Sequence, residues 1–298
     1  MQPIIVTHGG AGSPLEYKNG TEKAAKKGYI VLRKKGNAVD AVVEAVVVLE
    51  NDPRFNAGTG SRMRLDGSIG MDASVMGSDL KCGAVACIKN VKNPVKVARK
   101  IMETPHVLLA GEDATNFARK TGFRYYDPTT EKAIKKLEED KRKLRKGTFP
   151  LWAKKWKKFE YKKFTGTVGA VSRDKNGFAA AVSTGGTSFM LPGRVGDSAL
   201  IGCGIYAGRH GAVCATGVGE EIIRNVLSKS VYDKIDTLDP QKACEWGVNL
   251  LKGFPTGLIA VSKDDYGMSC SENMACTVAS KNLIKSGCIY SSSESVFF

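Results

Sequence analysis

The sequence predicts a layered α+β fold, and three observations lead to this prediction. Residues 167–184 alternate as two strands around the turn "DKNG", and residues 257–270 have the pattern of a second hairpin. Helical patterns occur in blocks between groups of strands rather than after every strand. Antiparallel hairpins combined with blocks of helices favour layered α+β packing over a strict βαβ alternation.

The first half of the chain contains these expected elements in order. Apolar runs predict a strand at 3–7 and shorter strands at 63–70, 74–76 and 82–88. Helical periodicity covers 21–35, 37–51, 93–104 and 111–122, with Asn37 as an N-cap and Pro94 in a first turn. A charged helix follows at 128–146, with Ile134, Leu137 and Leu144 on roughly one face.

The second half begins with an abrupt change of composition at residue 167. After the strands of 167–184 come a glycine-rich loop, a strand at 211–217, a helix that starts at 219, a helix near 239–251 and the hairpin of 257–270. No core-forming pattern is evident in 147–164, which contain two of the three tryptophans, and we expect a linker or arm there.

Composition places the chain among ordinary globular proteins. It has 298 residues, 42% of them hydrophobic and 25% charged. We find neither a signal-peptide pattern nor an apolar run long enough to span a bilayer, so we expect a cytoplasmic protein without a membrane partner. The eight cysteines form no CxxC pair and are expected to be reduced and buried, and the three scattered histidines argue against a zinc site.

The net charge of +15 is concentrated in one segment. Residues 131–163 hold fourteen Lys and Arg against five Asp and Glu, which gives 14 − 5 = +9. A basic segment can attract nucleic acid or another anionic partner, but it is more often a solvated linker. We therefore keep an anion-binding arm as an alternative and do not expect nucleic acid as the main partner.

The stretch "KKFTGTVGAV", residues 162–171, carries the strongest chemical signal. If the chain were cut between Gly166 and Thr167, Thr167 would carry a hydroxyl and a free α-amine. An α-amine has a pKa of about 7.7–8.0, so it can act as the general base for that hydroxyl. Such a nucleophile needs no histidine, which suits this composition. Taken alone, a threonine in this position is far more often an ordinary strand residue after a loop.

Three further stretches contain candidate site residues. "STGG", at 183–186, ends the strand expected to pair with the one at Thr167, which would place Thr184 beside it. "LPGRVGDS" contains Arg194 and Asp197, whose charges could bind the carboxylate and ammonium of an amino acid, or form a surface salt bridge. "ATGVGE", at 215–220, places a hydroxyl and glycine N–H groups at a strand-to-helix turn that could be an oxyanion hole or only a helix cap.

Together these motifs resemble the plant-type L-asparaginase/isoaspartyl peptidase branch of the N-terminal nucleophile hydrolases. The resemblance extends over most of the chain through "HGGAG", "NDPRFNAGTGS", "MDASVM", "GAVACI", "NPVKVARKIMETPHVLLAGEDATNFA", "TVGAV", "STGG", "PGRVGDS", "TGVGE" and "GLIAV". It implies one four-layer αββα domain over 1–298, made as a precursor that cuts itself into an α-subunit, 1–166 with the basic linker 128–166, and a β-subunit, 167–298. It also implies a homodimer of these αβ units.

The resemblance assigns roles to particular residues. It implies that Thr167 is the nucleophile, that the bond after Gly166 is cut, and that Thr184 supports the nucleophile's hydroxyl. Further roles implied are carboxylate and amine binding for Arg194 and Asp197, oxyanion donors for Thr216 and Gly217, and pocket lining for Gly219. Residues 49–59 resemble a sodium loop that includes Asn56, with a structural Na⁺ held by the main-chain carbonyls of Leu49, Glu50, Asp52, Phe55, Ala57 and Thr59. No cofactor is implied for catalysis.

The implied reaction is hydrolysis of the side-chain amide of L-asparagine or of the isopeptide bond of β-aspartyl peptides. The sequence departs from the usual pattern at Phe189 and Met190, at Thr256, and at Asn273, which leaves the preferred leaving group open. Glycosylasparaginase is a less favoured relative because the chain carries "HGGAG" and no secretory signal. A threonine aspartase is less favoured because no expanded substrate-binding insertion is evident.

Overall fold

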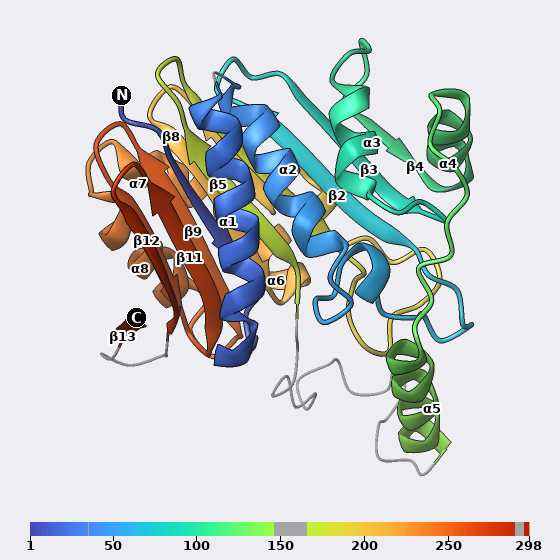
Figure 1. The fold of residues 1–298 in the computed structure, drawn as a ribbon. Helices are drawn as coiled ribbons and strands as arrows, with labels where there is room; N and C mark the ends of the chain where they lie inside the picture. Colours follow the sequence, from blue (N-terminus) through green and yellow to red (C-terminus); the bar gives the residue numbers. More distant parts are fainter. Residues whose placement is uncertain (35, 146–165, 290–294, 298) are drawn as a thin grey trace.

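The computed structural model describes residues 1–34, 36–145, 166–289 and 295–297 (Figure 1). Two β-sheets pack face to face, and helices cover the outer face of each sheet (Figure 1). Helices α1 (Lys18–Arg33), α2 (Ala38–Glu50), α3 (Pro94–Ile101) and α4 (Gly111–Lys120) lie on the larger sheet. Helices α7 (Leu227–Ile235) and α8 (Pro240–Leu250) cover the smaller one. This is the predicted αββα sandwich.

The larger sheet has nine strands in the order β13-β12-β11-β1-β5-β6-β2-β3-β4, and the smaller has four in the order β10-β9-β8-β7. All neighbouring pairs are antiparallel except β3 with β4. The bounds are β1 (Ile4–His8), β2 (Met71–Gly77), β3 (Cys82–Ile88), β4 (Leu108–Ala110), β5 (Val168–Arg173), β6 (Phe178–Thr184), β7 (Ile205–Gly208), β8 (Gly211–Gly217), β9 (Thr256–Ser262), β10 (Tyr266–Cys270), β11 (Met274–Ser280), β12 (Leu283–Ile289) and β13 (Ser295–Phe297). Two α-helices of the described residues remain, α5 (Glu131–Arg145) and α6 (Gly219–Arg224).

Strand alternation explains why four layers form. Successive side chains of a strand point to opposite faces, so a strand buried on both faces contributes to two apolar clusters. In β1, Ile5 packs under α1 and α2, whereas Ile4 and Val6 pack between the sheets. In β9, Ile259 packs between the sheets and Leu258 under the outer helices. Both strands are therefore buried on both faces along almost their whole length, without the buried-to-exposed alternation of a sheet with one solvent face.

Local signals in the sequence locate several elements correctly. The Asn37 side chain accepts a hydrogen bond from the backbone N–H of Asp40, as expected of an N-cap. Pro94 is the first residue of α3, where its missing N–H leaves no helical bond unmade. The predicted strands around "DKNG" are β5 and β6, paired in an antiparallel hairpin.

Three expectations about the elements are wrong. Residues 63–70 form no strand, because Arg64 turns inward there and binds backbone carbonyls. In α5, Ile134 is 46% exposed, whereas Ala133, Leu137 and Asp140 are buried; the side chain of Leu144 lies outside the described residues. The chain does not close with the hairpin of 257–270 but continues through β11, β12 and β13, and β7 was also not foreseen.

Among the described residues, no helix is both long and apolar enough to cross a membrane. Of the eight cysteines, the seven whose side chains the structure describes form no disulfide, as expected for reduced thiols, but Cys82 and Cys87 are half-buried rather than buried. The expected arm at 147–164 lies outside the described residues.

Candidate active site

Thr167 lies at the beginning of β5, in the middle of the larger sheet. Strand β5 runs between β1 and β6, and its pairing with β6 sets Val168 opposite Ser183. Continuing that register places Thr184, the last residue of β6, opposite Thr167. Both threonines are buried, with 6% of Thr167 and 3% of Thr184 exposed. The predicted neighbourhood of the two threonines is therefore confirmed by strand pairing.

The glycine turn after β1 packs against the bond between Gly166 and Thr167. Gly10 has a φ of +101°, and a Cβ there would lie 2.8 Å from both the carbonyl carbon of Gly166 and the carbonyl oxygen of Thr167. Only glycine permits this conformation and this approach. The sequence analysis quoted "HGGAG" only as a family motif, so this contact comes from the tertiary structure.

Strand β8 brings Thr216 to the same point from the smaller sheet. The Thr216 hydroxyl accepts a hydrogen bond from the backbone N–H of Ala11 at 3.2 Å. The same oxygen would lie 3.3 Å from a Cβ on Gly166. Gly217 has a φ of +148°, and a Cβ there would lie 2.2 Å from the carbonyl oxygen of Pro255. Both sheets thus contribute residues around the predicted cleavage bond.

Arg194 and Asp197 approach the first residue of α6. A Cβ on Gly219 would lie 2.7 Å from Nη2 of Arg194 and 2.8 Å from Oδ1 of Asp197, so the absence of a side chain at Gly219 leaves room for both groups. Asp197 is 3% exposed, and its Oδ2 has no hydrogen-bond partner among the described residues. Burial raises the pKa of this carboxyl to about 7. A buried, unsatisfied carboxylate oxygen is suited to binding the ammonium group of a ligand.

Glu220, which the sequence analysis did not single out, binds Arg194 directly. Nε and Nη2 of Arg194 each donate to one carboxylate oxygen of Glu220 at 3.1 Å. The signal in the sequence was an acidic residue directly after Gly219 in "TGVGE". Its partner could not be read there, because Arg194 lies 26 residues earlier in the chain.

Two buried residues from the segment before β3 fix the loop that carries Arg194. Arg64 is 2% exposed, and its Nη1 donates to the carbonyl oxygens of Leu191 and Arg194 at 2.8 and 2.9 Å. Asp72 accepts hydrogen bonds from the backbone N–H groups of Cys87 and Gly196. Burial raises the pKa of Asp72 despite these bonds. The sequence analysis assigned neither residue a role.

Asn56 connects the loop of residues 49–59 to the end of β6. The side-chain Nδ2 of Asn56 donates to the carbonyl oxygen of Gly186 at 2.6 Å. The backbone carbonyl oxygen of Asn56 accepts a hydrogen bond from the N–H of Gly185 at 3.0 Å. The hydroxyl of Thr184 accepts from the N–H of Gly186 at 3.0 Å. Two successive hydrogen bonds, through Gly186, therefore connect Asn56 to Thr184, the residue opposite the candidate nucleophile.

The loop of residues 49–59 is tightly wound, and two of its carbonyl oxygens lie close to glycines. A Cβ on Gly58 would lie 2.5 Å from the carbonyl oxygen of Glu50, and one on Gly60 would lie 1.9 Å from that of Phe55. The acidic side chains of the loop are engaged elsewhere. Glu50 accepts hydrogen bonds from Asn93 and from the backbone of Val95, and burial raises its pKa to about 7. A cation bound in this loop would therefore be held by main-chain oxygens rather than by carboxylates.

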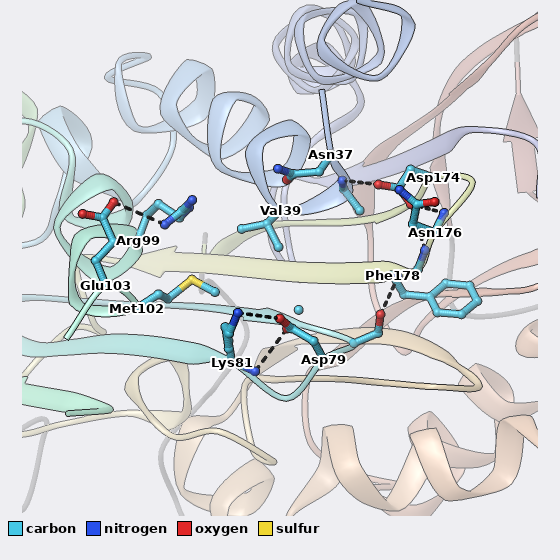
Figure 2. A pocket seen from close by; sticks show the side chains of 14 residues that line it. Asn37, Val39, Asp79, Lys81, Arg99, Met102, Glu103, Asp174, Asn176 and Phe178 are labelled. Carbon is cyan, nitrogen blue, oxygen red and sulfur yellow. Dashed lines mark hydrogen bonds and ion pairs between the residues drawn. The ribbon is translucent and has the colours of Figure 1, made fainter. Parts of the chain in front are cut away.

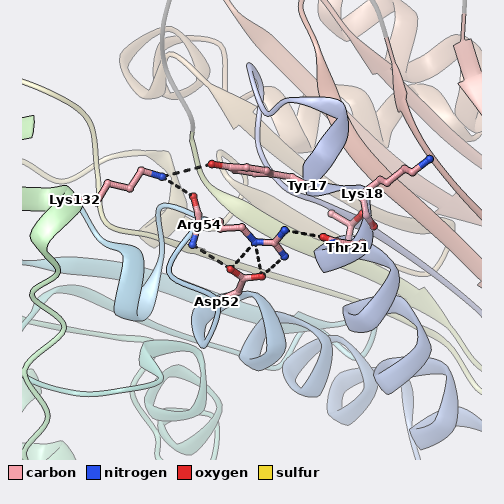
Figure 3. A network of polar contacts seen from close by, with 7 residues as sticks. Tyr17, Lys18, Thr21, Asp52, Arg54 and Lys132 are labelled. Atoms are coloured by element: carbon pink, nitrogen blue, oxygen red, sulfur yellow. Dashed lines mark hydrogen bonds and ion pairs between the residues drawn. The ribbon is translucent and has the colours of Figure 1, made fainter.

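Figure 3 shows how the outside of this loop is held. Asp52 accepts two hydrogen bonds from Nε of Arg54, at 2.9 and 3.1 Å (Figure 3). The guanidinium of Arg54 also lies over the ring of Tyr17, 5.5 Å from the ring centroid. Lys132 of α5 donates to the carbonyl oxygen of Arg54 at 3.3 Å (Figure 3). The start of α5 therefore contacts the loop through Lys132.

The structure also brings together a cysteine and a histidine, but they do not form a nucleophilic pair. Nδ1 of His8 accepts from the N–H of Gly10, so Nε2 carries the proton and faces Sγ of Cys214 at 3.3 Å. Burial lowers the pKa of His8 to about 3 and raises that of Cys214 well above its ordinary value. Both groups are neutral, so the pair contains no thiolate.

A cavity of ≈ 500 Å³ lies at the other end of β5 and β6 (Figure 2). Its charged groups are paired within the protein, although Nε of Arg99 makes no hydrogen bond among the described residues. Asp174 accepts hydrogen bonds from the N–H groups of Ala38, Asn176 and Gly177, and Lys81 pairs with Asp79 (Figure 2). The cavity is separated from Thr167 by the length of β5, so we do not assign the chemistry to it.

Comparison with known proteins identifies the chain's relatives. The family model described as asparaginase matches residues 1–288. The plant-type L-asparaginase of Pyrococcus abyssi is 46% identical over 257 residues, which are 83% of this chain and 84% of that protein. The isoaspartyl peptidase/L-asparaginase of Rattus norvegicus is 42% identical, covering 87% of this chain and 80% of that protein. The protein of the same name from Xenopus laevis is 39% identical, covering 95% and 93%.

Proposed function

The chain belongs to the asparaginase family, and we propose that it is a self-processing threonine amidohydrolase. Its proposed substrates are L-asparagine, giving L-aspartate and ammonia, and β-aspartyl peptides, giving aspartate and a peptide or amino acid. The names of the relatives, L-asparaginase and isoaspartyl peptidase/L-asparaginase, support both substrates. The observation that carries the proposal is the meeting of Gly10, Thr167, Thr184 and Thr216 around one peptide bond.

The first proposed step is cleavage of the chain. The hydroxyl oxygen of Thr167 attacks the carbonyl carbon of Gly166, the C–N bond breaks, and the acyl group moves from nitrogen to oxygen as an ester. Water then hydrolyses the ester and gives fragments 1–166 and 167–298. The new α-amine of Thr167 has a pKa near 7.7–8.0 and becomes the general base for the same residue's hydroxyl.

The second proposed step is substrate hydrolysis. The α-amine takes the hydroxyl proton of Thr167, and Oγ1 attacks the side-chain carbonyl of the substrate. Thr216 and the N–H of Gly217 hold the oxyanion, and Thr184 supports the nucleophile's hydroxyl. Ammonia or an amine leaves with the proton, and water releases aspartate from the acyl-enzyme. The protein supplies every group in this scheme, so we propose no catalytic cofactor.

Arg194 and Asp197 are the residues that we propose bind the amino-acid part of the substrate. The guanidinium binds the α-carboxylate and the carboxylate binds the α-ammonium, with Gly219 between them. Their convergence on Gly219 and the unpartnered Oδ2 of Asp197 support these roles.

A structural Na⁺ in residues 49–59 belongs to the same proposal, held by the carbonyls of Leu49, Glu50, Asp52, Phe55, Ala57 and Thr59. The tight winding of the loop, with the carbonyl oxygens of Glu50 and Phe55 close to Gly58 and Gly60, is the observation behind it. When bound, the ion would stiffen the loop that contains Asn56. We expect a higher melting temperature in NaCl than in tetramethylammonium chloride of equal ionic strength. Equal melting temperatures in both salts would contradict the sodium site.

We further propose a homodimer of αβ units and a cytoplasmic location. The reduced state of the described cysteines is in keeping with a reducing compartment. Light scattering after size-exclusion chromatography should give twice the mass of one chain. The alternative role of 131–163 as an anion-binding arm finds no support in the names of the relatives.

Intact-mass analysis after warm incubation tests the nucleophile. Wild type should give fragments that end at Gly166 and begin at Thr167, whereas Thr167→Ala should stay whole. Thr165→Ala is the matched control and should be cut like wild type. Cleavage at another bond, or equal cleavage of the Thr167→Ala chain, would overturn the assignment. Assays of L-asparagine against β-aspartyl dipeptides then measure the substrate preference.

A further inference from the structure

We propose that Glu220 is a positioning residue that holds Arg194 in the orientation needed to bind the substrate's α-carboxylate. Without Glu220, Arg194 is free to turn onto Asp197, and the two binding groups neutralise each other. The inference rests on the proposed function of Arg194 and Asp197 and adds the residue that keeps them apart.

The hydrogen bonds between Glu220 and Arg194 occupy one edge of the guanidinium. A guanidinium has five N–H donors in a plane and presents two edges that can each hold a carboxylate with two hydrogen bonds. Glu220 occupies the edge formed by Nε and Nη2, with both distances 3.1 Å. The edge formed by Nη1 and Nη2 remains for a second carboxylate. Arg194 can therefore bind Glu220 and a substrate carboxylate at the same time.

Glycines determine where the guanidinium lies. A Cβ on Gly196 would lie 2.6 Å from Nη1, and one on Gly219 would lie 2.7 Å from Nη2, so the plane rests against backbone on two sides. Gly186, two residues after Thr184, faces Nη1, because a Cβ there would lie 4.0 Å from that atom. Nη1, at the free edge, thus lies toward the end of β6, where Thr184 is placed opposite Thr167.

The nearest competitor for Arg194 is Asp197. Its Oδ2 is buried and unsatisfied, and both groups lie within 2.8 Å of one point beside Gly219. Even so, the two side chains form no hydrogen bond or ion pair in the described structure. A buried guanidinium and a neighbouring buried carboxylate with an unsatisfied oxygen attract each other strongly. The two hydrogen bonds from Arg194 to Glu220 oppose this attraction.

The exposed fractions of the two side chains agree with Glu220 holding Arg194 from the surface side. The Arg194 side chain is 17% exposed and the Glu220 side chain 49% exposed, so Glu220 lies at the surface and Arg194 beneath it. Glu220 can thus keep one carboxylate oxygen on each N–H while solvent surrounds the rest of the side chain. It does not reach the reacting atoms, so its effect should be on substrate binding rather than on the chemical step.

The test compares Glu220→Ala, Glu220→Gln and the control Glu221→Gln on the processed enzyme. Glu221 is the next residue of α6, and its side chain pairs with Arg224 instead. We expect Glu220→Ala to raise KM for L-asparagine about 10- to 100-fold with kcat changed less than about threefold. Glu220→Gln keeps one acceptor oxygen and should fall between Ala and wild type. Glu221→Gln should match wild type, and mass analysis should show normal chain cleavage in all three.

A second substrate separates positioning from a merely structural role. L-asparaginamide keeps the side-chain amide and the α-amine but lacks the α-carboxylate, so Arg194 has no partner on it. Glu220→Ala should therefore lower kcat/KM for L-asparagine far more than for L-asparaginamide. Equal losses on both substrates, or an unchanged KM for L-asparagine, would refute the role of Glu220. If wild type hydrolyses neither L-asparagine nor β-aspartyl dipeptides, the proposed function itself fails.

Discussion

Replacing Asp197 with asparagine should stabilise the fold above neutral pH. Burial raises the pKa of this carboxyl from 3.8 to about 7, and its Oδ2 has no partner in the described structure. The ionised form is therefore disfavoured in the folded protein, while the unfolded chain ionises near its ordinary pKa. Asparagine has the shape of the protonated acid and carries no charge, so it removes this penalty.

The magnitude follows from the pKa shift. Each pKa unit is about 1.36 kcal/mol, so a shift from 3.8 to about 7 is worth on the order of 4 kcal/mol. The folded pKa is raised, so the penalty in wild type is absent below pH 4, grows between pH 4 and 7, and is constant above pH 7. The advantage of Asp197→Asn follows the same curve. For a chain of 298 residues, this gain corresponds to about 6 °C in melting temperature.

The assay is thermal and urea unfolding from pH 4 to pH 8 at one protein concentration. Both chains carry Thr167→Ala, so that they remain uncut and unfold as single polypeptides. Asp239→Asn is the control, because this N-cap carboxyl is exposed and the backbone N–H of Lys242 lowers its pKa. It should show no gain at pH 8. A gain for Asp197→Asn that is equal at pH 4 and pH 8, or no gain at pH 8, would refute the reasoning about buried charge.

Three other predictions follow from the site and the fold. Gly10→Ala should slow chain cleavage at least tenfold by mass analysis, since its Cβ would collide with the Gly166 carbonyl; cleavage at the wild-type rate would contradict the contact. Asn37→Ala should lower the free energy of unfolding by about 1 kcal/mol in urea, and Asn37→Ser should restore most of it. For L-asparagine, kcat/KM should fall as pH drops through 7 because Asp197 becomes protonated. Protonation of the Thr167 α-amine, the general base, lowers kcat/KM for both substrates over this range, so the effect of Asp197 is the additional loss that L-asparagine shows relative to succinamate, which lacks the α-amine. Identical profiles would exclude Asp197 as the ammonium ligand.

Local structure was predictable because short-range interactions decide it. The N-cap at Asn37, the first-turn Pro94 and the turn at "DKNG" depend on neighbouring residues, and the structure contains each of them. The strand pair that sets Thr184 beside Thr167 was also predictable, since a short hairpin has one natural register. Residues 63–70 were misread because Arg64 binds carbonyls of a loop more than 120 residues away.

The site was predictable in its members but not in its arrangement. The motifs around Thr167, Arg194, Asp197 and Thr216 stood out in the sequence because each combines a reactive side chain with glycine. Glu220 did not stand out, since an acidic residue in the first turn of a helix is usually read as a favourable end charge. Only the fold showed that its carboxylate holds the guanidinium of Arg194.

By itself the sequence determined the layered fold class, the family resemblance, and a threonine that can be its own base once its peptide bond is cut. The tertiary structure decided which groups are buried together: Gly10 against the bond before Thr167, Glu220 on Arg194, and an Asp197 carboxyl with its pKa near 7. The physical reason is the distance along the chain over which each kind of interaction acts. Turns, caps and periodicity act over a few residues, whereas burial and charge pairing depend on two sheets that bring distant segments into contact.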